Sequence, residues 1–175
     1  MSVHSQKYYG YVVTNLNDTI KCQFIVQTNL FNKNIYYPYS KNIRIINNNG
    51  EKIKFKPNQL KSYSLSGSHV RDYKFVSLKY DNYKSFYDEV QNGKICFYYH
   101  YKLNTGGGDP IKTIHVLKNG IFKKISGFSM RKKFGEFIKD YPELYEKWKN
   151  SNKSFDLENM DYVAELCNKH FGSLN

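Results

Sequence analysis

Three cysteines and five histidines are among the residues of this 175-residue chain whose side chains could act as nucleophiles, bases or metal ligands. The cysteines form no Cys-x-x-Cys pair, and the histidines lack the HxH, HExxH and HxxxH spacings typical of metal sites. His100 and His115 flank a glycine-rich loop that contains Asp109, so a site at these three residues would depend entirely on how the chain folds. The cysteines lie in apolar segments, where a free thiol behaves as a small buried hydrophobe.

Other catalytic patterns are missing as well. Gly106-Gly107-Gly108 is followed by Asp-Pro rather than by the Gly-Lys-Ser/Thr that a phosphate-binding loop requires. No Gly-x-Ser-x-Gly elbow occurs. We therefore predict no metal, no cofactor and no enzymatic activity, with an enzyme assembled from scattered His, Cys and Asp residues as one alternative.

Tyrosine is concentrated in two short clusters. Three tyrosines between residues 36 and 39 lie in an expected loop, and residues 97–101 (FYYHY) form part of an expected strand. Alternation along a strand places Tyr98 and His100 on one face and the other three residues of the cluster on the opposite face. One face can then enter the core, while the face with Tyr98 and His100 offers apolar area and a hydroxyl to a partner. The predicted binding residues are Tyr98, His100, Tyr36, Tyr37 and Tyr39. In the alternative interpretation, the tyrosines only cover the sheet.

The basic charge of the chain is unevenly distributed. The formal net charge is +12, with +7 over residues 1–61, +5 over residues 62–129 and zero over residues 130–175. Lysines contact phosphates and aromatic rings stack on bases, so this composition is typical of polyanion binding. However, 24 of the 27 basic residues are lysine, which is poor at base readout, and A/T-rich codons would give the same composition. If the chain binds nucleic acid, the expected phosphate contacts are Lys7, Lys21, Lys52, Lys54, Lys56 and Lys61.

Short apolar segments separated by Asn, Asp and Gly predict antiparallel hairpins over residues 8–126. Expected turns include Asn15–Asp18, Asn47–Gly50 and Lys118–Gly120. Strands are expected at residues 9–13, 19–26, 43–46, 52–55, 61–65, 72–80, 94–102, 113–117 and 121–125. Residues 85–91 are expected to form a short helix that Asn92-Gly93 ends.

From residue 129 the apolar residues recur every three or four positions, which predicts about three helices over residues 129–172. Pro142 is expected to begin the second helix, and Asp156 to cap the third. The expected inward residues are Phe134, Phe137, Ile138, Tyr141, Leu144, Tyr145, Trp148, Met160, Val163, Ala164 and Cys167. The fold class is therefore α+β, treated as a single domain over residues 1–175, and no apolar run is long enough to span a membrane.

Several segments occur in an order that matches a known family. They are Gly10-Tyr11-Val12-Val13, Asn17–Lys21, Ile53, Phe55–Tyr63, Phe86, Val90, Gly93-Lys94-Ile95, Phe97-Tyr98, Asp140 and Pro142-Glu143-Leu144. In these segments the chain resembles a family of uncharacterised Bacteroidetes proteins that usually bear a signal peptide and are often labelled lipoproteins or secreted proteins. Tyr141 departs from that family, which has Cys before Pro-Glu, and the end of the chain lacks the Tyr-Asn pair common there.

The resemblance implies a small α+β fold and a periplasmic, cell-envelope or secreted location, but no activity or site residue. It also implies that a signal peptide precedes this sequence, because the first ten residues contain neither the basic nor the apolar region of one. A cytoplasmic location is the alternative. Together these features predict a non-enzymatic exported or cell-envelope domain that recognises a protein or an acidic glycan. The alternatives are a basic nucleic-acid-binding module and the enzyme described above.

Overall fold

The computed structural model describes residues 5–27, 40–66, 72–102, 104, 110–150 and 155–172. It has ten β-strands and three α-helices in the described residues, so the α+β prediction is confirmed. The chain forms two compact units: unit 1 contains residues 1–88 and 101–111, and unit 2 contains residues 89–100 and 112–175. Unit 2 therefore contains three strands as well as the three helices, so the chain does not divide into one unit of strands and one unit of helices. The single-domain prediction stays a prediction.

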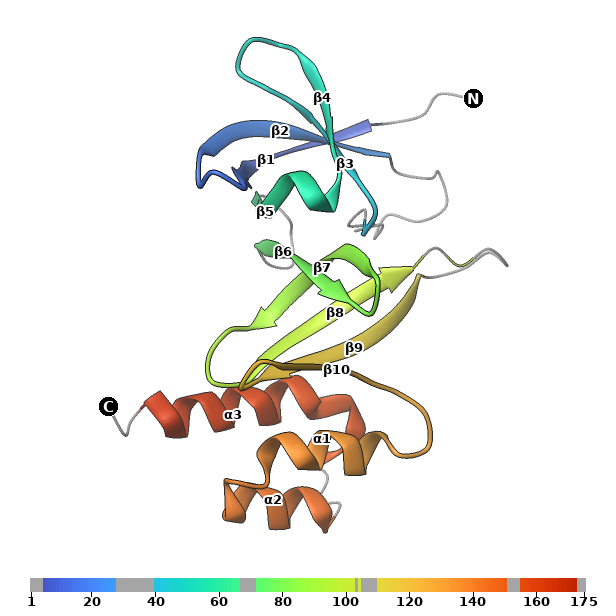
Figure 1. Ribbon diagram of the computed structural model, residues 1–175, viewed down its shortest axis with the longest axis vertical. Coiled ribbons are helices and arrows are strands. Elements are labelled where there is room, and N and C mark those ends of the chain that lie inside the picture. The colour runs from blue at the N-terminus through green and yellow to red at the C-terminus, as the bar shows by residue number, and fades with distance from the viewer. Residues whose placement is uncertain are drawn as a thin grey trace. The chain divides into compact units, whose positions relative to one another are not determined.

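Unit 1 is an antiparallel sheet with the strand order β4-β3-β2-β1-β5-β6-β7 (Figure 1). Its elements are β1 (Ser5–Thr14), β2 (Thr19–Gln27), β3 (Ile43–Ile46), β4 (Lys52–Phe55), a 3-10 turn η1 (Pro57–Gln59), β5 (Leu60–Ser66), β6 (Tyr73–Tyr80) and most of β7 (Tyr83–Gln91). The hairpins predicted between β1 and β2 and between β3 and β4 are confirmed. In the second, the Asn47 side chain accepts hydrogen bonds from the backbone N–H groups of Asn49 and Glu51, so local chemistry closes the turn.

The core of unit 1 is built around Tyr63, which is 1% exposed. Its ring stacks on Phe75 at 4.7 Å between centroids and meets Phe86 edge-on at 4.9 Å. Phe24 lies 5.6 Å from the same ring. Aromatic pairs at these distances add to the free energy gained by burying apolar area. This cluster joins β2, β5, β6 and β7 into one core.

The predicted helix at residues 85–91 is wrong, because these residues form most of β7. The strand pairs with β6 through a tight turn at which Tyr80 and Tyr83 are opposite each other. Phe86 and Tyr87 point to opposite faces, and they are 1% and 3% exposed. A helix would lose the β6 pairing and could not bury both rings in this way, so tertiary packing overrides the local signal.

Unit 2 packs three helices on one side of a small antiparallel sheet with the strand order β10-β9-β8-β7 (Figure 1). Besides the end of β7, its elements are β8 (Cys96–Lys102), β9 (Ile111–Lys118), β10 (Ile121–Ile125), α1 (Met130–Ile138), α2 (Pro142–Lys149), a 3-10 turn η3 (Leu157–Asn159) and α3 (Met160–Gly172). Asn119 and Gly120 both have positive φ values, of 51° and 76°, which gives the tight turn predicted between β9 and β10.

The three predicted helices and their inward faces are confirmed. Pro142 is at the start of α2, and the Asp156 side chain accepts a hydrogen bond from Leu157 N at the turn that leads into α3. Trp148 is 1% exposed, and its ring meets Phe134 at 4.9 Å. No helix in the described ranges has the length and apolar character needed to cross a bilayer.

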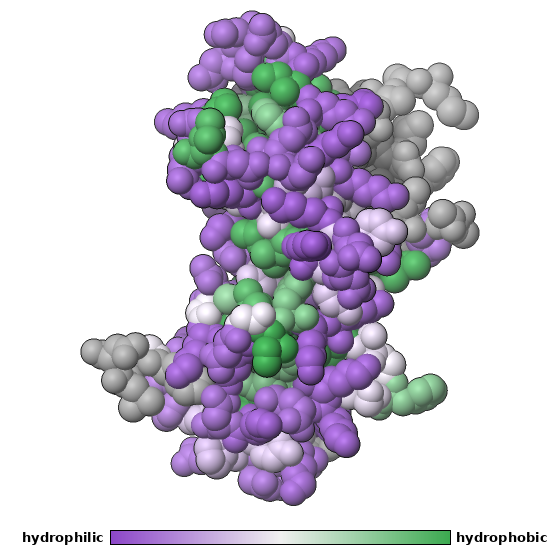
Figure 2. All heavy atoms as spheres, viewed as in Figure 1, coloured by the Kyte–Doolittle hydropathy of each residue, from purple (hydrophilic) through white to green (hydrophobic). Residues whose placement is uncertain are grey.

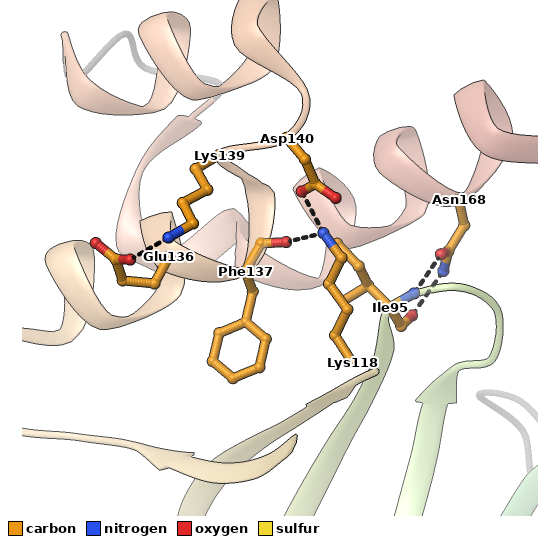
Figure 3. Close-up of polar contacts among 7 residues, drawn as sticks. All are labelled: Ile95, Lys118, Glu136, Phe137, Lys139, Asp140 and Asn168. Atoms are coloured by element: carbon orange, nitrogen blue, oxygen red, sulfur yellow. Dashed lines mark hydrogen bonds and ion pairs between the residues drawn. The ribbon is translucent and has the colours of Figure 1, made fainter. Parts of the chain in front are cut away.

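Polar side chains attach the helices of unit 2 to one another and to its strands (Figure 3). Lys118, only 7% exposed, donates a hydrogen bond of 2.7 Å to the Phe137 carbonyl at the end of α1 and forms an ion pair with Asp140. Asn168 of α3 accepts from the backbone N–H of Ile95 and donates to its carbonyl, at 2.9 and 2.8 Å. A cation at a helix C-terminus is favourable because the last carbonyls are unpaired.

Arg131 links α1 to the segments that follow it. Its guanidinium lies 4.5 Å from the centroid of the Trp148 ring and donates to the carbonyls of Trp148 and Phe155. It also pairs with Asp156 at 3.1 Å, and Trp148 Nε1 donates back to the Arg131 carbonyl at 2.9 Å. Arg131, like Lys118, therefore has a structural role in unit 2: both basic side chains hold helices in place.

Gly10 lies where the backbones of β1 and β5 approach each other closely. A Cβ atom at this position would lie 1.9 Å from the Ser64 carbonyl oxygen, far inside van der Waals contact. We expect Gly10→Ala to lower the free energy of unfolding by about 1–3 kcal/mol, because backbone atoms of β5 must move. Gly172→Ala is the control, since nothing lies within 4 Å of its added Cβ. Urea unfolding measures both, and an unchanged midpoint for Gly10→Ala would contradict the close approach.

The Lys118–Asp140 pair predicts a pH-dependent contribution to stability. Partial burial raises the pKa of the Asp140 carboxyl, but the hydrogen bond and charge of Lys118 outweigh it and hold the pKa below its ordinary value. The pair therefore stabilises the fold above the unfolded-state pKa of about 3.9, and this contribution is lost as the pH falls through the lowered folded-state pKa. We expect Asp140→Asn to lose up to about 1 kcal/mol at pH 7, because the carboxylate is half exposed, and this deficit to shrink as the pH falls through the lowered folded-state pKa of Asp140.

Urea titrations between pH 7 and pH 2 measure this difference. Glu136→Gln is the control, because Glu136 pairs with Lys139 on the exposed surface of α1 and its removal at pH 7 costs less than about 0.5 kcal/mol. A deficit of Asp140→Asn that stays constant down to the lowest pH would show that the carboxylate charge is not responsible.

Candidate functional site

Tyr98 and His100 are buried, with 3% and 8% exposure, so the prediction that they form an exposed contact face is wrong. The Tyr98 ring meets Phe122 edge-on at 5.8 Å, and the His100 ring meets His115 at 5.9 Å. Burial also raises the pKa of the Tyr98 hydroxyl, which therefore stays protonated. The physical reason is that β8 is an inner strand, between β7 and β9, and buries side chains on both faces.

The other predicted binding residues, Tyr36, Tyr37 and Tyr39, lie outside the described residues. The same is true of Asp109. Their roles stay predictions.

His100 and His115, which flank the glycine-rich loop in the sequence, lie side by side on the neighbouring strands β8 and β9. Thr113 Oγ1 donates to the His100 carbonyl at 3.2 Å, and the His115 ring lies 5.5 Å from that of Phe122. The pair is thus part of an aromatic cluster. Across the described ranges, no three His, Cys, Asp or Glu side chains are grouped to hold a metal ion.

The thiols are poorly suited to nucleophilic catalysis. Burial raises the pKa of Cys22 to about 11 and that of Cys167 to about 12, so both are protonated at neutral pH. Cys96 is half-buried, and its Sγ lies 3.3 Å from the Gly93 carbonyl oxygen. All three are free cysteines, and the prediction of buried thiols is confirmed for Cys22 and Cys167.

An open groove of about 580 Å³ lies between α2 and α3. Its lining residues are Tyr141, Leu144, Lys147, Phe155, Tyr162, Leu166, Lys169 and His170. It brings one histidine together with tyrosines and lysines, but with no cysteine or carboxylate. The groove therefore lacks the pairs of groups that the enzyme alternative needs.

A different surface concentrates exposed charge and aromatic rings, on the outer face of the unit 1 sheet. Directly opposed residues of antiparallel strands point to the same face, so the register identifies its members. One cross-strand row runs Lys21–Tyr11–Ser64–Lys74 over β2, β1, β5 and β6. The next row runs Lys52–Ile46–Gln23–Tyr9–Ser66 over β4, β3, β2, β1 and β5. Arg44 and Lys54, opposite each other on β3 and β4, extend the same face.

We call this surface the basic tyrosine face and define it by Tyr9, Tyr11, Lys21, Arg44, Lys52, Lys54 and Lys74. Tyr9 is 65% exposed and Tyr11 39%. All five basic side chains are exposed. Within the described residues, Lys21, Arg44, Lys52 and Lys54 make no ion pair. These cations are therefore available to anions from outside.

Acidic residues are excluded from the strands that form the basic tyrosine face. Strands β1 to β6 contain eight lysine or arginine residues and no aspartate or glutamate. The acidic residues described in unit 1 lie in turns, beside strand ends or in β7: Asp18, Glu51, Asp72, Asp81 and Asp88. Hydrophilic residues cover most of the visible surface around β1 to β5 (Figure 2). The positive potential of the face is thus not cancelled along its strands.

Three of the six predicted phosphate contacts, Lys21, Lys52 and Lys54, lie on the basic tyrosine face. Lys56 lies beyond the end of β4, and Lys61 is at the bulge between β5 and β1, where its Nζ donates to Asn17 Oδ1. The position of Lys7 in β1 is described, but its side chain lies outside the described residues.

Sequence reasoning missed Tyr9, Tyr11, Arg44 and Lys74. A signal was present in β1, where the tyrosines alternate with the inward residues Gly10 and Val12. Period-two alternation would have placed both tyrosines on one face. It would not have shown that Lys21 and Lys74 share that face, because strand neighbours come from distant parts of the chain.

No family model, curated protein or solved structure matches the chain. The resemblance to the Bacteroidetes family stays a prediction.

Proposed function

We propose that this protein is a non-enzymatic binding module for an acidic polymer, which docks on the basic tyrosine face of unit 1. The observation that carries the proposal is the pair of adjacent cross-strand rows, each of which aligns an exposed tyrosine with a lysine. Neighbouring strands are about 4.8 Å apart, so the six strands from β4 to β6 extend this face over about 24 Å. A polymer with an anionic group in each repeat can contact several of these cations at once.

Electrostatics favours an acidic polymer over a folded protein as the partner. Lysine is depleted in the cores of protein interfaces, where desolvating its ammonium group is costly. A flexible polyanion releases bound counterions when lysines neutralise it, and each ammonium group can stay partly hydrated. The exposed tyrosines add apolar contact area beside the charges. Nucleic acids and acidic glycans are both polyanions of this kind.

The reactive groups of the described residues support a binding role rather than catalysis. The buried thiols of Cys22 and Cys167 are protonated, and the His100–His115 pair is enclosed among aromatic rings. Lys118 and Arg131 are engaged in holding helices. By contrast, Lys21, Arg44, Lys52 and Lys54 of unit 1 make no ion pair within the described residues.

The exported location implied by the family resemblance is a separate proposal. It predicts that the natural gene encodes a signal peptide upstream of this sequence, and that the mature protein begins after a cleavage site. N-terminal sequencing of the protein isolated from its source tests this. An unprocessed start at Met1 in the isolated protein would reject the exported location without affecting the binding proposal.

A charge-neutralising variant tests the binding proposal. We expect K21Q/K52Q/K54Q to weaken binding of fluorescein-labelled heparin and of a labelled 20-nucleotide oligo(dT) at least tenfold at about 50 mM salt. For the oligonucleotide, losing three phosphate contacts should reduce the slope of log K against log salt by about 2, since each contact contributes about 0.7. Anisotropy titrations at about 50 and 200 mM salt measure both quantities.

K123Q/K132Q/K147Q is the matched control, because it removes the same charge from exposed lysines of unit 2. Its affinity for both probes should stay within about twofold of the wild type. Equal weakening by the two triple variants would mean that only net charge matters and would overturn a localised site. Failure of the wild type to bind either probe would overturn the function itself.

A further inference from the structure

We infer that the acidic polymer is a single-stranded nucleic acid whose bases stack on Tyr9 and Tyr11 while its phosphates lie over β2 to β4. The inference rests on the proposed function and narrows it from polyanions in general to one chemical class. A single-stranded nucleic acid would contact the exposed tyrosine rings, which a purely electrostatic site would not need.

The spacing of the two tyrosines selects an open strand. Tyr9 and Tyr11 are two residues apart on β1 and share one face, so the strand rise of about 3.4 Å per residue separates their rings by about 7 Å. Stacked bases in a duplex strand are about 3.4 Å apart. Two neighbouring bases can each meet a tyrosine only after they have left their own stack. A duplex keeps its base faces inside and offers the rings no stacking partner.

Four of the five cations of the basic tyrosine face, Lys21, Arg44, Lys52 and Lys54, lie on one side of the rings. Lys21 is directly opposite Tyr11 on β2, about 5 Å away between strands. Lys52 lies three strands from Tyr9 in its row, about 14 Å away. On the other side of β1, Ser64 and Ser66 of β5 occupy the row positions, and Lys74 of β6 lies beyond Ser64. Four of the five cations of the face thus lie on the β2 to β4 side, and we place the sugars and phosphates of bases that stack over β1 on that side.

The residue types favour binding that tolerates any sequence. Every base has a flat face that a tyrosine can stack on, whereas base-specific contacts require paired donors and acceptors. Lysine acts as a point charge, and Arg44 is the one guanidinium among the residues that define the face. We therefore expect DNA and RNA single strands of mixed sequence to bind with similar affinity.

Two double variants test the inference: Y9A/Y11A removes both rings, and Y9F/Y11F keeps the rings but removes their hydroxyls. Y9A/Y11A should bind the labelled 20-nucleotide oligo(dT) at least tenfold more weakly than the wild type, whereas Y9F/Y11F should stay within about threefold, because phenylalanine keeps the stacking face. Tyr162→Ala is the control, since it removes a 46% exposed tyrosine from α3 of unit 2. Circular dichroism and the urea midpoint establish that each variant is folded.

Four probes separate this inference from the proposed function: oligo(dT), an abasic strand with the same number of phosphates, a duplex of the same length, and heparin. The wild type should bind oligo(dT) at least tenfold more tightly than the abasic strand and the duplex, and Y9A/Y11A should change heparin binding less than twofold. Equal affinity for oligo(dT) and the abasic strand, or an unchanged oligo(dT) affinity in Y9A/Y11A, would overturn the inference. If heparin binding still depends on Lys21, Lys52 and Lys54, the proposed function stands while this inference falls.

Discussion

The pairing of β1 with β2 on one edge and β5 on the other is the constraint on which unit 1 depends. The register places Tyr8 and Val12 in the core and turns Tyr9 and Tyr11 outward. Because side chains alternate along a strand, a slip of one residue would bury both exposed tyrosines and expose the core residues. Gly10 makes the pairing with β5 feasible, since a Cβ there would lie 1.9 Å from a backbone oxygen. The same register thus defines both the core and the basic tyrosine face.

The two units use charge in different ways. Strands β1 to β6 of unit 1 contain basic residues but no acidic residue, an arrangement in which like charges repel and which the aromatic core around Tyr63 must offset. The helical region of unit 2 has as many acidic as basic residues, and several of them pair. Lys118 and Arg131 act there as helix anchors. That Lys21, Arg44, Lys52 and Lys54 make no ion pair within the described residues is consistent with a binding role for the face that they share.

Local chemistry explains which parts of the fold could be predicted. The turns at Asn47–Gly50 and Asn119-Gly120 depend on side-chain hydrogen bonds or positive φ values within a few residues, and both were predicted. The helical stripe at Phe134, Phe137 and Ile138 is equally local. The predictions for residues 85–91 and for Tyr98 with His100 failed for a different reason. A pattern of period two shows that two faces exist, but it does not show that neighbouring strands and packed rings bury both of them.

The sequence by itself determined the α+β class, the hairpin turns, the inward faces of the helices and an excess of lysine in the first two-thirds of the chain. The tertiary structure decided which lysines act together, and it separated Lys21, Lys52 and Lys54 from Lys56 and Lys61. The tertiary structure also placed Tyr9 and Tyr11 beside these cations and buried the tyrosine that seemed most available from its strand pattern, Tyr98. The physical reason is that alternation fixes the face of each side chain within its own strand. Which strands become neighbours depends on contacts between distant segments, such as β1 with β5, and on the shared core that those contacts bury.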